Sequence, residues 1–375
     1  MRFDHYLRRV MSGAERGPRA ASLRAALAVA EPFYAAAAVL RNRMYDRRVL
    51  AVRTLPRPVV SIGNLTAGGT GKTPVVRWLA SKLREEGRRV AILSRGYRAA
   101  GGAGALGDEQ LMLDRLLNGA GAAPDAAPVT IRAHPDRVAA ADAALRQSPS
   151  TDVFLLDDGF QHRRVARDLD IVLVNCTDPF GHGRVLPRGL LREPLSGLRR
   201  AGAVVLTHAD RVDEARREQI EMEILRRRPD APIFRAVHAP LAFRTGDADV
   251  LPLDALRARR VFAFSGLASP EAFERDVREL CGSYAHQWFA DHHTYRPHDC
   301  AQVQAAARAA GADVVVTTEK DWAKLADLAP PGRDDLAVWR LDVAIQFSRD
   351  DEQRLLAIVR EAISPSAAPV PPRAG

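Results

Sequence analysis

The sequence of 375 residues is poor in cysteine and in aromatic residues. Its three cysteines, Cys176, Cys281 and Cys300, form no CxxC pair. A small, odd number of cysteines argues against a disulfide framework and favours a reducing compartment. Aromatic residues make up only 6% of the chain and form no stacking run, and no known nucleic-acid-binding motif is present. We therefore expect no nucleic-acid partner.

Long uninterrupted apolar runs are also missing. The most apolar stretch near the N-terminus, residues 23–40, contains Arg24, Glu31 and Pro32, which make it a poor transmembrane span. No secretory signal is evident. An alanine-rich helix with basic flanks fits this composition better, and it either lies on a membrane surface or packs as an ordinary helix. The last twelve residues, 364–375, are rich in proline and alanine and are expected to be disordered.

Positive charge, in contrast, is plentiful. The formal net charge is +9 and the sequence pI is about 10.0. This balance favours anionic partners such as phosphates or acidic lipid surfaces. A high-GC genome that prefers arginine to lysine would give the same balance, so charge alone does not identify the partner. Hydrophobic residues make up 47% of the chain, enough for a sizeable core, and the length suggests two domains.

Short apolar segments alternate with amphipathic segments along most of the chain. This alternation predicts an α/β fold: a P-loop NTPase-like parallel sheet with helices on both faces, plus a second, smaller α/β domain. Residues 232–259 form an extended stretch in which we place the domain junction. The expected helices cover residues 72–86, 270–280 and 300–310. The expected strands cover residues 57–63, 90–93, 152–157, 171–174, 203–206, 260–264 and 313–318.

The strongest local signal is TAGGTGKT, residues 66–73, between an expected strand and an expected helix. Backbone N–H groups in such a loop form an anion-binding nest, and the helix N-terminus adds partial positive charge. Lys72 can reach nucleotide phosphates and Thr73 can hold Mg²⁺, so ATP and Mg²⁺ are the predicted cofactors. Thr66 replaces the first glycine of the strict pattern, which leaves a chance glycine-rich turn as the alternative. The predicted phosphate-binding residues are Thr66, Ala67, Gly68, Gly69, Thr70, Gly71, Lys72 and Thr73.

Two carboxylates, Asp157 and Asp158, end the apolar segment VFLLDD. Ligands of open α/β sheets bind beyond the carboxyl ends of the strands, where a carboxylate can join the Mg²⁺ shell of a nucleotide. The pair therefore predicts a Walker B element, with a turn or helix cap as the alternative. Residues 207–210, THAD, faintly resemble the guanine-reading element of GTPases, but His208 replaces its lysine, so we do not expect a GTPase.

Two further groups of polar residues are less specific. Asp108 and Glu109, in GDEQ, supply a candidate base for an acceptor hydroxyl or simply begin a helix. In FADHHTY, residues 289–295, Asp291 precedes His292 and His293, and a carboxylate beside a histidine can orient it and raise its basicity. No cysteine or regularly spaced ligand accompanies these histidines, so a metal site there has little support.

Several segments together resemble the tetraacyldisaccharide 4′-kinases of Gram-negative bacteria. They follow the family's order, cover residues 25 to 360 approximately, and are far more specific together than the phosphate loop alone. The family has threonine at the position of Thr66, so that departure supports the resemblance. The segments are SIGNLTAGGTGKTPVV (61–76), ILSRGYR (92–98), GDEQ (107–110), DDGFQHRRVARDLDIVLVN (157–175), GHGRVLPRGLLREP (181–194), FSGLASPEAF (264–273), FADHHTY (289–295) and TTEKDWAKL (317–325).

The resemblance implies transfer of the γ-phosphoryl group of ATP to the 4′-hydroxyl of a tetraacylated disaccharide 1-phosphate, giving lipid IVA in lipid A biosynthesis. It implies a peripheral protein on the cytoplasmic face of the inner membrane, with a membrane-associating N-terminal helix and no obligate protein partner. Combined with the local patterns, it divides the chain into an N-terminal segment (1–48), a P-loop kinase domain (49–232), a linker with a second α/β domain (233–363) and a tail (364–375).

The resemblance also implies roles for single residues. Asp108 matches the proposed catalytic base. His292, beside Asp291, would assist Asp108 across a cleft between the two domains, and His293 is the competing assignment. Lys72 would act on the transferring phosphoryl group. The remaining implied roles are Thr73, Asp157 and Asp158 at the metal, and Arg95, Gln161 and His162 lining the substrate or nucleotide site.

Three residues depart from the family pattern. Gln110 stands where proline is usual, and Arg188 and Leu190 stand where alanine and proline are usual. These positions concern loop shape and not the reacting groups. Two other function classes stay open: a P-loop switch or assembly ATPase that hydrolyses ATP without a sugar acceptor, and a kinase of a soluble hydroxyl compound. The apolar N-terminal segment argues mildly against the soluble acceptor.

Overall fold

The computed structural model describes residues 3–68, 70–96, 106–119, 127–245, 249–267, 270–290, 293–325 and 335–364. The chain forms two compact units. The first unit contains residues 1–95, 129–237 and 346–375, and the second contains residues 96–128 and 238–345. Two of the crossings between the units fall within long strands, β7 (Ile233–Thr245) and β12 (Val338–Phe347).

The first unit is built on a parallel sheet. Its strands lie in the order β3-β2-β4-β1-β5-β6-β7, and all neighbours in this order run parallel. β1, β2, β4 and β6 are buried along their whole length, as expected for a parallel sheet covered on both faces. The strands before β7 are β1 (Val59–Asn64), β2 (Val90–Ser94), β3 (Thr130–Ala133), β4 (Val153–Asp157), β5 (Leu169–Asn175) and β6 (Ala203–Thr207).

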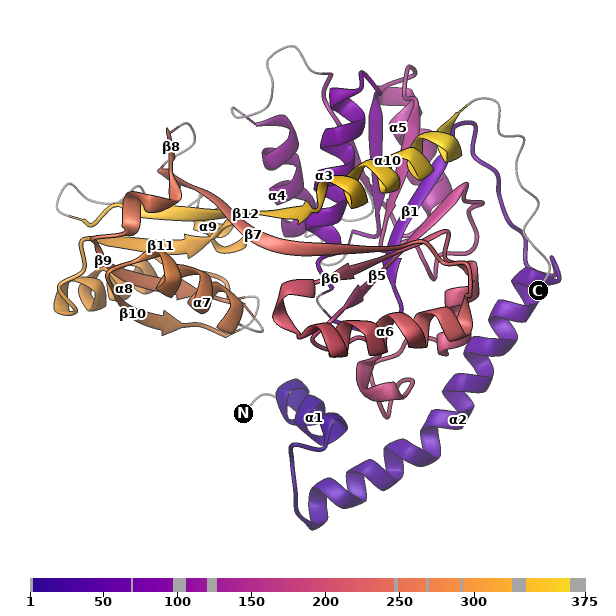
Figure 1. Cartoon of the computed structure of the whole chain (residues 1–375), viewed down its shortest axis with the longest axis horizontal. Coiled ribbons are helices and arrows are strands. Elements are labelled where there is room, and N and C mark those ends of the chain that lie inside the picture. The colour runs from indigo at the N-terminus through magenta and orange to yellow at the C-terminus, as the bar shows by residue number, and fades with distance from the viewer. Residues whose placement is uncertain are drawn as a thin grey trace. The chain divides into compact units, whose positions relative to one another are not determined.

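Helices cover this sheet (Figure 1). α3 contacts β1, β2 and β4, while α5 contacts β2 and β3, and α10 contacts β1. Ile220 and Ile224 of α6 pack in the same cluster as Val172 of β5 and Val204 of β6. The predicted P-loop-like α/β fold is therefore confirmed. The helices are α3 (Lys72–Glu85), α5 (Arg137–Gln147), α6 (Glu214–Arg227) and α10 (Arg349–Ile363), with short 3₁₀ turns η1 (Gly181–Gly183), η2 (Leu195–Arg200) and η3 (Ala209–Arg211).

The second unit is a smaller α/β structure. Its strands follow the order β10-β9-β11-β12 with parallel neighbours, and β8 pairs antiparallel with β7. Phe243, Val261, Phe273 and Trp339 lie in one core cluster of this unit. Its further elements are α4 (Asp108–Asn118), β8 (Asp249–Leu251), η4 (Leu253–Leu256), β9 (Arg260–Ser265), α7 (Glu271–Leu280), β10 (Ser283–Trp288), α8 (Pro297–Ala309), β11 (Val314–Thr318) and α9 (Glu319–Leu325).

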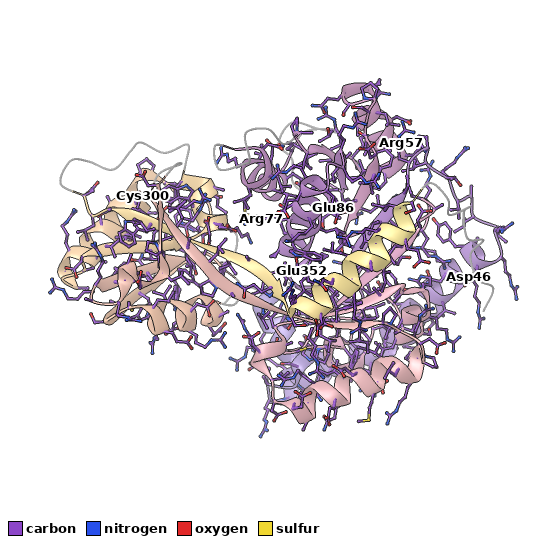
Figure 2. The ribbon with its side chains drawn as sticks, turned by 45° about the horizontal axis from the view of Figure 1, so that its top comes forward. Asp46, Arg57, Arg77, Glu86, Cys300 and Glu352 are labelled. Carbon is purple, nitrogen blue, oxygen red and sulfur yellow. The ribbon has the colours of Figure 1, made fainter. Side chains whose placement is uncertain are left out.

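The C-terminal helix α10 belongs to the first unit, although the predicted second domain runs to residue 363. Two ion pairs join it to the α3 region. Lys82 Nζ lies 2.9 Å from Glu352 Oε1, and Arg360 Nη2 lies 2.6 Å from Glu86 Oε1. Glu86 and Glu352 are labelled in Figure 2. The chain thus returns to the first unit after it has built the second.

The helix α4 differs from the predicted boundaries in the opposite way. It lies within the predicted P-loop domain in the sequence but belongs to the second unit. There it packs against α9, and Arg115 Nη1 donates a hydrogen bond to the Ala323 carbonyl at 3.1 Å. Boundaries drawn at single points of the sequence cannot describe a chain that leaves and re-enters both units.

The N-terminal segment forms two helices of the first unit, α1 (Phe3–Ser12) and α2 (Pro18–Asp46). α2 is longer than the expected 23–40 and, by length and composition alone, could cross a membrane. Soluble core helices and signal sequences pass the same test, but the apolar window of α2 is not buried. Val29, Phe33 and Leu40 are 68%, 73% and 61% exposed, and their spacing places them on one face of the helix.

Candidate active site

The phosphate loop connects β1 to α3, which begins at Lys72 with Thr73 as its second residue. Gly71 immediately before it has φ +75°, and Gly68 has φ +139°. Both values lie in the left-handed region that favours glycine. Gly69 lies outside the described residues. Because the first turn of a helix directs backbone N–H groups away from its own carbonyls, this end of α3 is suited to bind phosphate.

Two neighbouring segments hold the start of the loop. The Asn64 side-chain amide donates to the Thr66 carbonyl at 2.7 Å. The Ala67 N–H donates to the Leu190 carbonyl at 2.6 Å. Thr66 is itself buried, so the threonine that departs from the strict pattern has a structural place in the loop. Leu190, one of the departures from the family pattern, bonds through its backbone, which any residue supplies.

Lys72 and Asp158 lie together beside this loop. Lys72 Nζ is 3.6 Å from Asp158 Oδ1 and 3.3 Å from Asn64 Oδ1. Arg192 Nη1 donates to both oxygens of Asp158, at 2.9 and 2.8 Å. Burial opposes ionisation of Asp158, but the charges of Lys72 and Arg192 outweigh it and hold the pKa of this carboxyl below its usual value. Asp158 is therefore an anion between two cations.

Asp157, the last residue of β4, is buried. Its carbonyl accepts a hydrogen bond from Arg137 Nη2 at 3.3 Å, and Arg137 is only 1% exposed. Among the described residues, no three His, Cys, Asp or Glu side chains cluster closely enough to hold a metal ion. A Mg²⁺ ion that is also bound by nucleotide phosphates needs only one or two carboxylates, so Asp157, Asp158 and Thr73 fit that role.

A buried polar network continues from Arg192. The Gln161 side-chain amide donates to the Asn64 carbonyl at 2.8 Å and to Glu193 Oε1 at 3.0 Å. Arg200 Nη2 donates to both oxygens of Glu193, at 2.9 and 3.0 Å. Glu193 is only 2% exposed, and this arginine supplies the cation that a buried carboxylate requires.

The polar side of α2 joins the same network. Asn42 Nδ2 donates to Glu193 Oε2 at 2.6 Å, and the Tyr34 hydroxyl donates to the Arg192 carbonyl at 3.1 Å. Glu31 Oε2 lies 3.3 Å from Nη1 of Arg188, another departure from the family pattern. The N-terminal helix is thus bonded, within the first unit, to the segment that supplies Arg192 to Asp158.

The expected substrate-lining residues are less closely grouped. Gln161 belongs to the network, while Arg95 directly follows β2 and is exposed. Burial, together with the charges of Arg137 and Arg167, lowers the pKa of His162 to about 4, so its imidazole is neutral near pH 7. Their contact with a substrate stays a prediction.

Asp108 is the first residue of α4 in the second unit, and its side chain is not described. At this helix start the Gly107 N–H donates to Gln110 Oε1 at 3.2 Å, so Gln110 has a capping role where the family usually has proline. Asp291 and His292 lie outside the described residues. The predicted boundaries place Asp108 and His292 in different domains, whereas α4 and the segments flanking residues 291–292 belong to one unit. That Asp108 and His292 act together stays a prediction.

His293, the competing histidine, is described. Its Nε2 lies 3.2 Å from Asp299 Oδ2, and its ring stacks on Phe289 with centroids 4.7 Å apart. Its carbonyl accepts a hydrogen bond from Lys324 Nζ at 3.1 Å. These contacts tie His293 to its own unit and give it a structural role.

A cleft of about 720 Å³ lies beside the end of β6. The Thr207 hydroxyl, at the end of that strand, donates to the Thr70 carbonyl of the phosphate loop at 3.1 Å. Ala209 and Asp210, two and three residues further on, line the cleft together with side chains of α6, β7 and the start of α10. Apolar Phe347 and charged residues both contribute to its walls, so the cleft offers apolar and polar contacts beyond the end of β6.

Residues 23–364 match the family model of the tetraacyldisaccharide-1-P 4′-kinases, LpxK. The chain belongs to this family. The tetraacyldisaccharide 4′-kinase of Anaeromyxobacter sp. (strain K) is 43% identical over 374 residues, covering 95% of this chain and 96% of the relative. That of Geobacter sulfurreducens is 40% identical over 334 residues, covering 85% and 89%. A crystal structure of LpxK from Aquifex aeolicus in complex with ATP has a TM-score of 0.69 at 30% identity, covering 91% of this chain and 100% of that chain.

The resemblance to the 4′-kinase family is thereby confirmed, but the sequence interpretation missed part of the site. Several network residues stand inside the quoted family segments without carrying a recognised phosphate- or metal-binding signal. Asn42, Arg137 and Arg200 stand in none of these segments, and only their contacts in the folded chain reveal them. The residues missed are Asn42, Asn64, Arg137, Arg192, Glu193 and Arg200.

Proposed function

We propose that this chain transfers the γ-phosphoryl group of ATP to the 4′-hydroxyl of a tetraacyldisaccharide 1-phosphate, giving lipid IVA in lipid A biosynthesis. The observation that carries the proposal is the Lys72–Asp158–Arg192 cluster beside a phosphate loop, in a chain of the 4′-kinase family. Phosphoryl transfer depends mainly on positioning and on electrostatic stabilisation, and this cluster supplies both charges and fixed geometry.

Lys72, on the first turn of α3, is the proposed ligand of the β- and γ-phosphates. Its neighbour Asp158 holds it next to the loop. Thr73, Asp157 and Asp158 are the proposed Mg²⁺ ligands. When bound, the ion would offset negative charge on the transferring group. Arg192 keeps Asp158 ionised and oriented for this role.

The cleft beside β6 is the proposed site of the adenosine half of ATP. Thr207, two residues before the cleft-lining Ala209, donates a hydrogen bond to the Thr70 carbonyl of the phosphate loop. Phe347 and other apolar side chains offer a surface for a purine, and polar groups such as Asp210 would contact the ribose.

Asp108 is the proposed base that takes the proton of the 4′-hydroxyl, with His292 and Asp291 assisting it. Family resemblance supports these roles. Replacing Asp108 by alanine should lower kcat far more than it weakens ATP binding, because a base acts only on the chemical step. An Asp108→Ala enzyme that kept near-normal turnover would contradict the assignment.

The proposed location is the cytoplasmic face of the inner membrane, with α2 lying on the surface. The exposed stripe of Val29, Phe33 and Leu40 supports this proposal, since an apolar face of this kind can sink into the headgroup region. Arg43 and Arg47 are exposed near the end of the helix, where they could contact anionic lipids.

The test is transfer of label from γ-labelled ATP to the tetraacylated disaccharide 1-phosphate in detergent micelles with Mg²⁺. We expect labelled lipid with the wild type and at least a ~100-fold lower rate with Lys72→Ala. Lys82→Ala is the matched control, because Lys82 lies on the same helix but pairs with Glu352. Its rate should stay within about 2-fold of the wild type.

ATP turnover without labelled lipid would contradict the lipid kinase and favour one of the two alternatives. Stimulation of that turnover by an added protein would indicate a switch ATPase. Label in a water-soluble hydroxyl compound would indicate a kinase with a soluble acceptor.

A further inference from the structure

The short helix α9 lies in TTEKDWAKL, a segment to which the proposed mechanism gives no role. Thr318 caps it: the Thr318 hydroxyl accepts a hydrogen bond from the Asp321 N–H at 3.1 Å and donates one to Asp321 Oδ2 at 2.8 Å. Such a cap usually lies at the surface. Asp321, however, has no exposed area at all, and its carboxylate makes further contacts outside the helix.

Asp321 binds the turn that follows β9. Its Oδ2 accepts a hydrogen bond from the Gly266 N–H at 2.9 Å, and its Oδ1 lies 3.4 Å from Lys324 Nζ. Since β9 and β11 are neighbours, one buried carboxylate joins the carboxyl ends of two adjacent strands. This is the edge at which α/β sheets place their functional groups.

Lys324 extends from α9 to the loop after β10. Its Nζ donates to the His293 carbonyl at 3.1 Å, while the His293 N–H donates to the Ala290 carbonyl at 3.0 Å. Gly266 lies close to Asp321, Ala290 and His293. A Cβ added there would stand 3.2 Å from Asp321 Oδ1 and 3.3 Å from both the Ala290 carbonyl and the His293 Cβ. Ala290 and His293, the residues on either side of 291–292, thus both lie against Gly266.

The helix α9 also contacts α4, the helix that begins at Asp108. Arg115 of α4 donates to the Ala323 carbonyl of α9 at 3.1 Å. One helix of seven residues therefore contacts both segments that carry the proposed base and its proposed assistants.

We infer that Asp321 and Lys324 are positioning residues for phosphoryl transfer: they fix the backbone on both sides of Asp291 and His292 relative to the helix of Asp108. This inference rests on the proposed function, because it requires Asp108 and His292 to act together. Removing the Lys324 amine frees the His293 carbonyl and leaves Asp321 buried without a cation. A base displaced by about 1 Å can lose on the order of 100-fold in rate.

The experiment compares Lys324→Met, Lys324→Arg and Gly266→Ala with the wild type in the labelled-lipid assay. We expect kcat to fall at least ~10-fold in Lys324→Met and Gly266→Ala, while the KM for ATP changes less than about 2-fold. The limb of the pH–rate profile that reports the base should move in both variants. Lys324→Arg, which keeps the charge and the donors, should restore most of the lost kcat.

Asp313→Asn is the matched control. Asp313 Oδ2 accepts the Arg260 N–H at 2.8 Å and its Oδ1 pairs with the Arg260 guanidinium at 3.1 Å, at the other end of β9. We expect its kcat and pH–rate profile to match the wild type. An equal kcat loss in Asp313→Asn would overturn the inference, because destabilising the unit would then suffice.

The outcomes separate the inference from the proposed function. A wild type that labels no lipid would overturn the function itself. An active wild type with an inactive Asp108→Ala, but with Lys324→Met and Gly266→Ala at the wild-type kcat and pH–rate profile, would overturn the inference alone. Gly266→Ala removes no charged side chain, so the comparison holds even if Lys324→Met folds poorly.

Discussion

In the first unit, neighbouring groups shift the pKa values of single side chains and so fix their charge states. Asp158 is the clearest case. It lies between Lys72 and Arg192, which depress the pKa of its carboxyl. When the pH falls below 3.8, the usual pKa of this carboxyl, Asp158 takes up a proton in the unfolded chain but stays ionised in the folded site. The stabilisation is therefore complete above that pH and is lost only as the pH falls through the lower folded value.

His162 gives a pH dependence in the same direction as Asp158, but in a higher pH range. Its folded pKa is about 4 against a usual 6.5, because burial and nearby arginines disfavour the imidazolium. Between these values only the unfolded state binds the proton, so the free energy of unfolding falls as the pH drops. We expect His162→Asn to remove about 1 kcal/mol of this decrease between pH 7 and pH 5, after allowance for solvent screening. Urea unfolding at several pH values measures it, and parallel curves for both proteins would contradict it.

Glu193 tests the buried network that the sequence did not reveal. It is 2% exposed and bonds to Arg200, Gln161 and Asn42. Glu193→Gln leaves the Arg200 guanidinium without its anion, so we expect the free energy of unfolding to fall by about 3 kcal/mol. Denaturant unfolding measures this loss.

The control for Glu193→Gln is Glu223→Gln, which breaks pairs with Arg226 and Arg227, whose side chains are 71% and 46% exposed. An exposed pair contributes less than about 1 kcal/mol. Similar losses in both variants would show that burial of Glu193 is not what makes its pair important.

Among the elements, α2 has two sides with different surroundings. Asn42 and Tyr34 bond to the site segment, while Phe33 and Leu40 are exposed on the apolar stripe. We expect Phe33→Ser with Leu40→Ser to weaken binding to anionic lipid vesicles at least ~10-fold, because each side chain contributes about 1.5–3 kcal/mol when it leaves water. Vesicle sedimentation measures binding.

The matched control for the α2 variant is Met222→Ser, since Met222 is 51% exposed on α6, outside the stripe. We expect its vesicle binding to equal that of the wild type. Both proteins should unfold at an unchanged denaturant concentration, because the substituted side chains are exposed. Equal vesicle binding by the α2 variant and the wild type would contradict the surface role of α2.

Elements with a strong period could be predicted from the sequence, and those defined by tertiary contacts could not. β1 and α3 were predictable because a buried apolar run and a 3.6-residue period flank the phosphate loop. α9 was not, because seven residues are too few to show a helical period. The spacing of residues 66–73 and 157–158 was enough to predict phosphate and metal binding. The pairing of Glu193 with Arg200 and the contact of α4 with α9 depend on distant segments.

At the scale of the whole molecule, the phosphate loop and the proposed metal ligands belong to the first unit, whereas α4 and α9 belong to the second. A ligand that binds only the folded state stabilises it by about 2.7 kcal/mol at a hundredfold excess over Kd. We expect ATP·Mg²⁺ alone to slow hydrogen–deuterium exchange in β1 and β5 and to leave β9 and β11 unchanged.

Lys72→Ala, and removal of Mg²⁺ by EDTA, should each abolish the protection of β1 and β5, because both remove ligands of the phosphates. Gly266→Ala should keep it, since Gly266 lies at the end of β9 in the second unit. Protection of all four strands by ATP·Mg²⁺ would instead mean that nucleotide binding orders both units together. The positioning of Asp108 by α9 would then depend on the nucleotide and would not be a fixed property of the second unit.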